Sequence, residues 1–218
     1  MFDNIMNKLG IYDLIGVMYT GVAITAISLL LNKVLCITEL RFDDNIINDT
    51  FLFFMVSYFI GIIFQEIGSF LIRYVLFRNN KLLSEALNAK DNDPYLMSKE
   101  EMTCLRKKIK DECKIDKDNL DPLYIYNHCR CFCEEHRDIT KVDREQSNAA
   151  MSRSFSTYFF IMSVVSAVII ISKGCTQHIW LVPILVFLGI LMFVRFKRFT
   201  INRYVHILRM YLHQNKDV

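Results

Sequence analysis

Residues 51–72 read FLFFMVSYFIGIIFQEIGSFLI, and this stretch of 22 residues decides the fold class. Its only charged side chain is that of Glu66. An α-helix rises about 1.5 Å per residue, so about 20 apolar residues cross the roughly 30 Å hydrocarbon core of a bilayer. The stretch is therefore predicted to form a membrane-spanning helix.

Three further runs are similarly apolar and somewhat shorter. They contain 18, 18 and 16 residues and cover Leu14–Leu31, Phe155–Ser172 and Ile179–Val194. The last run is short, but Phe196 extends it if the Arg195 side chain reaches toward the lipid headgroups. None of the runs has the polar stripe of an amphipathic surface helix. We therefore favour four transmembrane helices over four buried helices of a soluble globule.

The polar stretch between the second and third runs has helix signals and no strand pattern. Ser98 and Glu101 match a capping box that begins a helix reaching about Cys113, and Asp121 begins a helix reaching about His136. The chain is thus predicted to be an all-α integral membrane protein with four transmembrane helices and a small cytoplasmic helical module. The predicted parts are an N-terminal amphipathic segment with spans one and two at 1–73, the module at 74–154, spans three and four at 155–195, and a basic helical tail at 196–218.

Lysine and arginine residues are distributed unevenly around the four runs. Only Lys33, Arg41 and Lys173 lie in the two loops that follow the first and third runs. By the positive-inside bias, both termini and the middle stretch face the cytoplasm. The middle stretch 73–154 is nearly neutral, with 16 Lys and Arg against 15 Asp and Glu, so it contributes only +1 of the net charge of +3, and the excess lies beside the membrane. The lipid bilayer is the expected partner, and direct nucleic-acid binding is not expected.

The second run also carries the most unusual polar and small residues of the four runs. Small residues spaced four apart let two helix backbones approach closely, so Ser57 and Gly61 are predicted to lie on a helix-packing face. Glu66 must be paired, protonated or hydrated, because a carboxylate in lipid costs several kcal/mol. The predicted pore or helix-packing residues are Ser57, Gly61, Gln65, Glu66 and Ser69.

Two interpretations of Glu66 remain open. In one, copies of this carboxylate form a ring or polar gate in an oligomeric pore. In the other, Glu66 has a partner within the same chain. The candidates for that partner are Arg73, Ser154, Thr157 and Tyr158.

Seven cysteines divide between the two predicted sides of the membrane. Cys36 and Cys175 fall in the two outer loops, one in each, so one outer disulfide is a candidate; two unpaired cysteines fit the sequence equally well. On the inner side, Cys129, Cys133 and His136 share a helix face and are weak candidates for zinc ligands. Because no C-x2-C knuckle is present, we favour cysteines packed as small apolar side chains and expect no metal or cofactor.

Enzymatic signatures are nearly absent. Arg130-x5-His136 is similar to the arginine–histidine spacing of HEPN-class ribonucleases, although Cys131 stands where a polar residue follows that arginine. No G-x-S-x-G, phosphate-binding glycine loop or H-E-x-x-H is found. A non-enzyme is therefore predicted, and a HEPN-like ribonuclease is kept as the third hypothesis.

Several short segments resemble a family of bacterial membrane proteins. They are Ile11-Tyr12-Asp13-Leu14-Ile15-Gly16, Ser57-Tyr58-x2-Gly61-x3-Gln65-Glu66, the stretch 148–154 and the basic helical tail. Together they are similar to small multi-span proteins associated with anti-phage and CRISPR systems, above all the accessory membrane proteins of type VI-B CRISPR. This chain has Thr20-Gly21 where the family's first span has Pro-Gly.

The resemblance implies an inner-membrane effector or regulator that perturbs the bacterial membrane during infection, without catalytic residues. The function predicted from the sequence is accordingly an oligomeric inner-membrane pore or membrane-disrupting effector, triggered from the cytoplasmic side by a protein or a nucleotide. The alternative is a non-conducting membrane anchor or scaffold that binds a cytoplasmic partner.

Overall fold

The computed structural model describes residues 11–35, 46–72, 74, 81–87, 96–113, 121–136, 139–174 and 176–213. Within these ranges every regular element is a helix and none is a strand, which confirms the predicted all-α class. The N-terminal segment before Ile11 and both outer-loop cysteines, Cys36 and Cys175, lie outside the described residues. The helices are α2 (Ile11–Val34), α3 (Ile46–Leu71), α4 (Lys81–Leu87), α5 (Lys99–Cys113), α6 (Pro122–His136), α7 (Thr140–Lys173), the short η2 (Thr176–His178) and α8 (Leu181–Leu212).

Three of the described helices are long and apolar enough to cross a membrane. The candidate spans are Gly16–Val34 in α2, Thr50–Leu71 in α3 and the helix Thr140–Lys173, which is α7. The fourth predicted span forms the beginning of α8. Only 14 residues there precede Arg195, and two more cations follow by position 198. The uncharged part of the fourth run is therefore shorter than the about 20 residues that a membrane span needs.

The chain divides into two compact units. One comprises residues 1–72 and 147–196, and the other comprises 73–146 and 197–218. We name the first the apolar unit, because it contains α2, α3 and the apolar parts of α7 and α8. We name the second the helical module; it contains α4, α5 and α6 together with the polar ends of α7 and α8.

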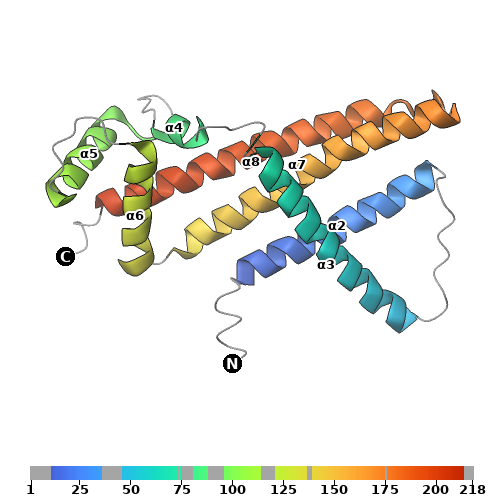
Figure 1. Cartoon of the computed structure of the whole chain (residues 1–218), viewed down its shortest axis with the longest axis horizontal. Helices are drawn as coiled ribbons and strands as arrows, with labels where there is room; N and C mark the ends of the chain where they lie inside the picture. The colour runs from blue at the N-terminus through green and yellow to red at the C-terminus, as the bar shows by residue number, and fades with distance from the viewer. Residues whose placement is uncertain are drawn as a thin grey trace. The chain divides into compact units, whose positions relative to one another are not determined.

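In the apolar unit, α7 and α8 run side by side (Figure 1). The Ser156 hydroxyl of α7 donates to the Gly189 carbonyl of α8 over 2.9 Å. α7 ends at Lys173 and is followed by Gly174, whose φ of +66° is a left-handed conformation that favours glycine. An apolar core of this unit also receives Ile60 and Phe64 of α3, which pack against it. Its buried members are Ile24, Leu31, Leu35, Phe155, Tyr158, Phe159, Ile170, Leu181 and Leu185.

The crossing of α2 and α3 brings two backbones together (Figure 1). A Cβ atom added to Gly21 of α2 would overlap the Ser57 carbonyl oxygen of α3, and one added to Gly61 would overlap the Val17 carbonyl oxygen. This crossing therefore requires glycine on both helices, because no side chain can be accommodated between the two backbones.

The helical module has the helix caps expected from its sequence. The Ser98 hydroxyl accepts from the Glu101 N–H over 3.1 Å, and the Glu101 carboxylate accepts from the Ser98 N–H over 2.9 Å. The Asp121 carboxylate likewise accepts from the Leu123 N–H at the start of α6. The end of α8 supplies much of the module's core, with buried Val205, Ile207, Leu208 and Tyr211.

Candidate functional site

The predicted polar and small residues of α3 lie on two different faces of that helix. Ser57 and Gly61 are buried, Gly61 against α2. Gly68, seven residues after Gly61 and so on the same face, lies against α7, where its Cβ would be 3.0 Å from the Thr157 hydroxyl oxygen. Glu66 is exposed, because two residues rotate a helix by about 200° and turn its side chain away from this face.

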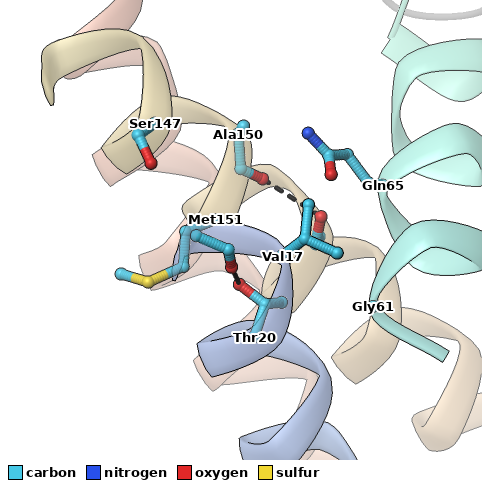
Figure 2. Close-up of a pocket in the computed structure, with 9 residues that line it drawn as sticks. Val17, Thr20, Gly61, Gln65, Ser147, Ala150 and Met151 are labelled. Carbon is cyan, nitrogen blue, oxygen red and sulfur yellow. Dashed lines mark hydrogen bonds between the residues drawn. The ribbon is translucent and has the colours of Figure 1, made fainter. Parts of the chain in front are cut away.

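A small polar pocket lies where α2, α3 and α7 meet (Figure 2). It has room for about one water molecule. Gln65 of α3 extends its amide toward α7 (Figure 2). The lining residues are Gly16, Val17 and Thr20 of α2, Gly61 and Gln65 of α3, and Ser147, Ala150, Met151 and Ser154 of α7.

The two buried hydroxyl groups that line this pocket already donate their hydrogens. The Thr20 hydroxyl donates to the Gly16 carbonyl oxygen over 2.6 Å, and the Ser154 hydroxyl donates to the Ala150 carbonyl oxygen over 3.1 Å. Each hydroxyl has only one hydrogen, so its remaining lone pairs can only accept. Toward the pocket, Thr20 and Ser154 therefore act as acceptors.

Ser69, another of the predicted site residues, does not line the pocket. Its hydroxyl donates to the Gln65 carbonyl oxygen over 2.8 Å, within the last turns of α3. Such a bond to the carbonyl four residues earlier satisfies a polar group without another helix. The polar hydroxyl of Ser69 is thus satisfied within its own helix.

Glu66 belongs to an outward apolar face of α3. Phe59, Ile63 and Phe70 lie seven or fewer residues away on that face and are 56%, 53% and 59% exposed. Within the described ranges Glu66 has no hydrogen bond or ion pair. The carboxylate is therefore surrounded by side chains that would face lipid in a membrane.

Three of the four candidate partners of Glu66 within the chain are placed elsewhere. Ser154 donates to Ala150, and the Tyr158 hydroxyl lies 2.9 Å from the Ser28 hydroxyl of α2. Thr157 lies against Gly68 on the opposite face of α3. Arg73, the fourth candidate, lies outside the described residues.

Sequence reasoning named Ser154 and Tyr158 of α7 only as possible partners of Glu66, and it did not name Thr20 of α2 as a site residue. Thr20 and Ser154 are 2% exposed, and Tyr158 is 1% exposed. For the two residues of α7, the signal in the sequence is the spacing of Ser147, Met151, Ser154 and Tyr158, which places three polar groups on one face of that helix. That spacing identifies a polar face, but it does not identify the helix that packs on it.

The structure describes two of the three candidate zinc ligands of helix α6, Cys129 and Cys133. Cys129 and Cys133 are fully buried, and the Cys133 thiol lies 3.7 Å from the Ile207 carbonyl oxygen. Burial raises the pKa of the Cys129 thiol far above its usual range, which disfavours the thiolate that zinc binds. In the described part of the chain no group of three His, Cys, Asp or Glu side chains is placed to hold a metal ion, and the His136 side chain lies outside it.

Of the HEPN-like pair Arg130 and His136, the structure describes only the arginine side chain. Arg130 Nε donates to the Glu134 carboxylate over 2.6 Å, one turn along α6. The Arg130 side chain is 49% exposed, and this exposed ion pair contributes at most about 1 kcal/mol to stability. Because the His136 side chain lies outside the described residues, the predicted arginine–histidine pair is not tested.

A polar cluster holds the end of α8 in the helical module. The buried Tyr211 hydroxyl donates to the Glu112 carboxylate and lies 3.3 Å from His128 Nε2. Lys108 Nζ donates to the Tyr211 carbonyl oxygen over 3.0 Å, which caps the last turn of α8. Cys113 Sγ lies 3.8 Å from the imidazole of His128. Sequence patterns did not indicate this cluster, because its members come from three separate helices.

We expect the Tyr211→Phe variant to lower the free energy of unfolding of the module by about 1–2 kcal/mol near neutral pH, because Glu112 loses its hydrogen bond. Burial and donation to Glu112 raise the pKa of the Tyr211 phenol. The unfolded chain releases this proton above about pH 10, so the contribution is complete below that pH and decreases above it. Thermal melting in detergent between pH 8 and 11 measures both effects.

The control for this experiment is Tyr204→Phe, in the same helix. Tyr204 packs edge to face on Tyr126, and its hydroxyl makes no hydrogen bond to any described residue. Its variant should melt as the wild type does at every pH. An equal loss for the two variants would show that the Tyr211 hydroxyl has no special role.

Comparison with known proteins returned no match: no protein-family model, no curated protein and no solved structure is significantly similar to this chain. The likeness to CRISPR-associated membrane proteins therefore stays a prediction from short segments.

Proposed function

We propose that this chain is a multi-pass protein of the bacterial inner membrane that assembles into a homo-oligomeric pore. Three helices of sufficient length and apolarity support insertion into a bilayer. In the proposed topology the beginning of α8 is a short fourth span, and both termini lie in the cytoplasm. The distribution of lysine and arginine in the sequence supports that orientation.

The observation that carries the proposal is the outward position of Glu66. A lone carboxylate that faces lipid costs several kcal/mol. Glu66 precedes Leu71, the end of the candidate span, by about 8 Å along the helix axis, so it lies inside the apolar stretch. A second copy of α3 at this face would replace lipid by protein and water. Repetition of the contact around an axis would then produce a ring of carboxylates, which attracts cations.

The biological role proposed for this pore is that of an effector in anti-phage defence, perturbing the membrane after a signal from the cytoplasm. Its support is the resemblance of the spans to CRISPR-associated membrane proteins. The helical module, with its own core and its own polar cluster, is the part of the chain proposed to receive a protein or nucleotide trigger.

Reconstitution into lipid vesicles tests the proposal directly. We expect the purified chain to release a trapped cation-sensitive dye faster than empty vesicles, and to form a symmetric oligomer with Glu66 at its axis. A monomer in detergent with the leakage of empty vesicles would instead support the anchor.

The anchor hypothesis has one observation in its favour. Leu123 and Tyr124, adjacent in the first turn of α6, are 42% and 41% exposed and could together contact a partner. Under this alternative, the Leu123→Ser variant would abolish partner binding without changing vesicle leakage.

Topology is tested by thiol labelling of intact cells. Cys104 and Cys131 are exposed in the helical module, so they report which side of the membrane the module occupies. We expect a membrane-impermeant maleimide to label neither thiol until the cells are opened, whereas Cys36 and Cys175 should be labelled from outside or be oxidised. Labelling of Cys131 in intact cells would invert the proposed topology.

A further inference from the structure

We propose that the Tyr19 hydroxyl of one copy donates a hydrogen bond to the Glu66 carboxylate of the next copy, where the outer face of α2 meets the outer face of α3. The contact rests on the homo-oligomer proposed above and specifies the two surfaces that meet. The partner is therefore a second copy of this chain.

The Tyr19 side chain lies on the surface of the apolar unit. It is 64% exposed and follows Gly16, where the candidate span of α2 begins, by three residues. Toward the described part of the chain it makes no hydrogen bond, ion pair or ring contact. A phenol hydroxyl has one hydrogen to donate. In a membrane, Tyr19 therefore presents an unused donor near one end of the span.

Tyr19 and Glu66 differ from the other exposed polar side chains in the helices of the apolar unit. In the described parts of α2, α3, α7 and α8 that belong to this unit, every other exposed polar side chain already has an interaction within the chain. These satisfied residues are Lys33, Thr50, Ser172, Lys173 and Arg195. One donor and one acceptor are thus left for a contact with another molecule.

The two groups lie on opposite sides of the α2–α3 pair. Gly61 of α3 lies against Val17 and Gly21 of α2. Tyr19 is two residues from each of these α2 residues, so the helix turns its side chain by about 200° away from α3. Glu66 is turned away from α2 in the same manner. The Tyr19 hydroxyl is therefore directed toward a neighbouring molecule and away from the Glu66 of its own chain.

Both groups also lie close to the crossing of the two helices. Tyr19 is at the crossing itself, and Glu66 follows Gly61 by about 8 Å along the axis of α3. A second copy that places the outer face of its α2 on the outer face of α3 can thus bring Tyr19 beside Glu66. Because each copy uses two different faces, the contact is heterologous and can repeat until a ring closes. Around that ring, α2 of each copy lies between successive α3 helices.

Polar groups decide which apolar faces meet in a membrane. Lipid tails are as apolar as the exposed Phe59 and Ile63 side chains, so covering these side chains with protein gains little. A carboxylate or a hydroxyl without a partner in hydrocarbon is costly, and a hydrogen bond between the two removes part of that cost. The Glu66 carboxylate has two oxygens, so one can accept from Tyr19 while the other attracts cations at the axis.

The test is fluorescence energy transfer between two differently labelled populations of the full chain, diluted stepwise in lipid vesicles. We expect Tyr19→Phe, which removes only the hydroxyl, to raise the dissociation constant of the oligomer about tenfold. Glu66→Leu should weaken association at least as much. In the Glu66→Leu background, Tyr19→Phe should have no further effect, because the contact is already lost.

Tyr58→Phe is the matched control. Tyr58 lies within the candidate span of α3, packs edge to face on Phe59 and makes no hydrogen bond to any described residue. This variant should associate as the wild type does. Equal weakening by Tyr19→Phe and Tyr58→Phe would overturn the contact. A full effect of Tyr19→Phe in the Glu66→Leu background would also overturn it, because Tyr19 would then act through another partner, such as the lipid headgroups.

Cysteine cross-linking tests the heterologous geometry. Copies with Tyr19→Cys and copies with Glu66→Cys carry different tags and are mixed in one membrane. We expect oxidation to link the two tags above the level of tagged wild-type copies, and neither variant to link to itself above that level. Self-linking of Glu66→Cys without linking to Tyr19→Cys would show that two copies of α3 meet directly, which overturns the contact.

The same measurements separate this contact from the oligomer on which it rests. Energy transfer in the wild type that does not respond to Tyr19→Phe refutes the contact alone. A wild type without energy transfer at any dilution is a monomer, which refutes the homo-oligomer together with the contact.

Discussion

Replacing Glu66 with glutamine is expected to reduce the preference of the reconstituted protein for cations over anions at least tenfold, while the amount of assembled protein stays the same. The amide has the shape of the carboxylate without its charge, so helix packing is preserved and the proposed ring loses its attraction for cations. The exposed position of Glu66 is the reason to expect unchanged folding. Ion flux in vesicles, normalised to the amount of oligomer, measures the effect.

Two control variants make this result specific. Glu66→Asp keeps the charge and should keep the selectivity of the wild type. Glu85→Gln removes an exposed carboxylate of the helical module, which pairs with Lys197 over 2.8 Å, and should leave flux unchanged. If Glu66→Gln instead lowers the yield of folded protein, Glu66 has a structural partner, because a broken buried contact leaves that partner unsatisfied.

The second large effect is expected from Gly21→Ala, which should destabilise the apolar unit by about 3 kcal/mol or more. The added methyl group would overlap the Ser57 carbonyl oxygen, and this obstacle is backbone. Relief requires α2 and α3 to separate, which removes close contacts along the whole crossing. Loss of folded protein in detergent, followed by melting and size-exclusion chromatography, measures the effect.

Gly189→Ala serves as the control, because its added methyl group would meet a movable side chain. The nearest atom is in the Phe160 ring at 3.1 Å, and a small rotation of that ring relieves the contact. A cost of about 1 kcal/mol or less is expected, since repacking can absorb the change. Wild-type melting of Gly21→Ala would show that α2 and α3 do not cross at this point in the membrane.

Much of the local structure could be predicted from the sequence, because its signals act between residues that are close in the chain. The apolar runs indicated helices, and α2, α3 and α7 contain three of the four predicted spans. The capping box at Ser98 and the cap at Asp121 marked the starts of α5 and α6. The fourth run is the exception. It is helical, but Arg195, Lys197 and Arg198 come so soon after its start that composition alone does not identify it as a span.

The candidate site could be predicted only in part. Small and polar residues in α3 were evident, but their division into a buried face with Gly61 and an exposed face with Glu66 depends on which helices pack on α3. The pocket requires Thr20, Gln65 and Ser154 from three helices far apart in the chain. Likewise, the cluster around Tyr211 joins α5, α6 and α8.

By itself, the sequence determined the all-helical class, three candidate spans, and the caps that begin α5 and α6. These features follow from side-chain composition, the helix period and hydrogen bonds within one turn, and all three act locally. Only the tertiary structure decided that Glu66 points outward, that Gly21 and Gly61 lie at a backbone crossing, and that Thr20 and Ser154 turn acceptor oxygens toward one pocket. The helix period shows which residues share a face, but packing between distant segments determines what that face meets.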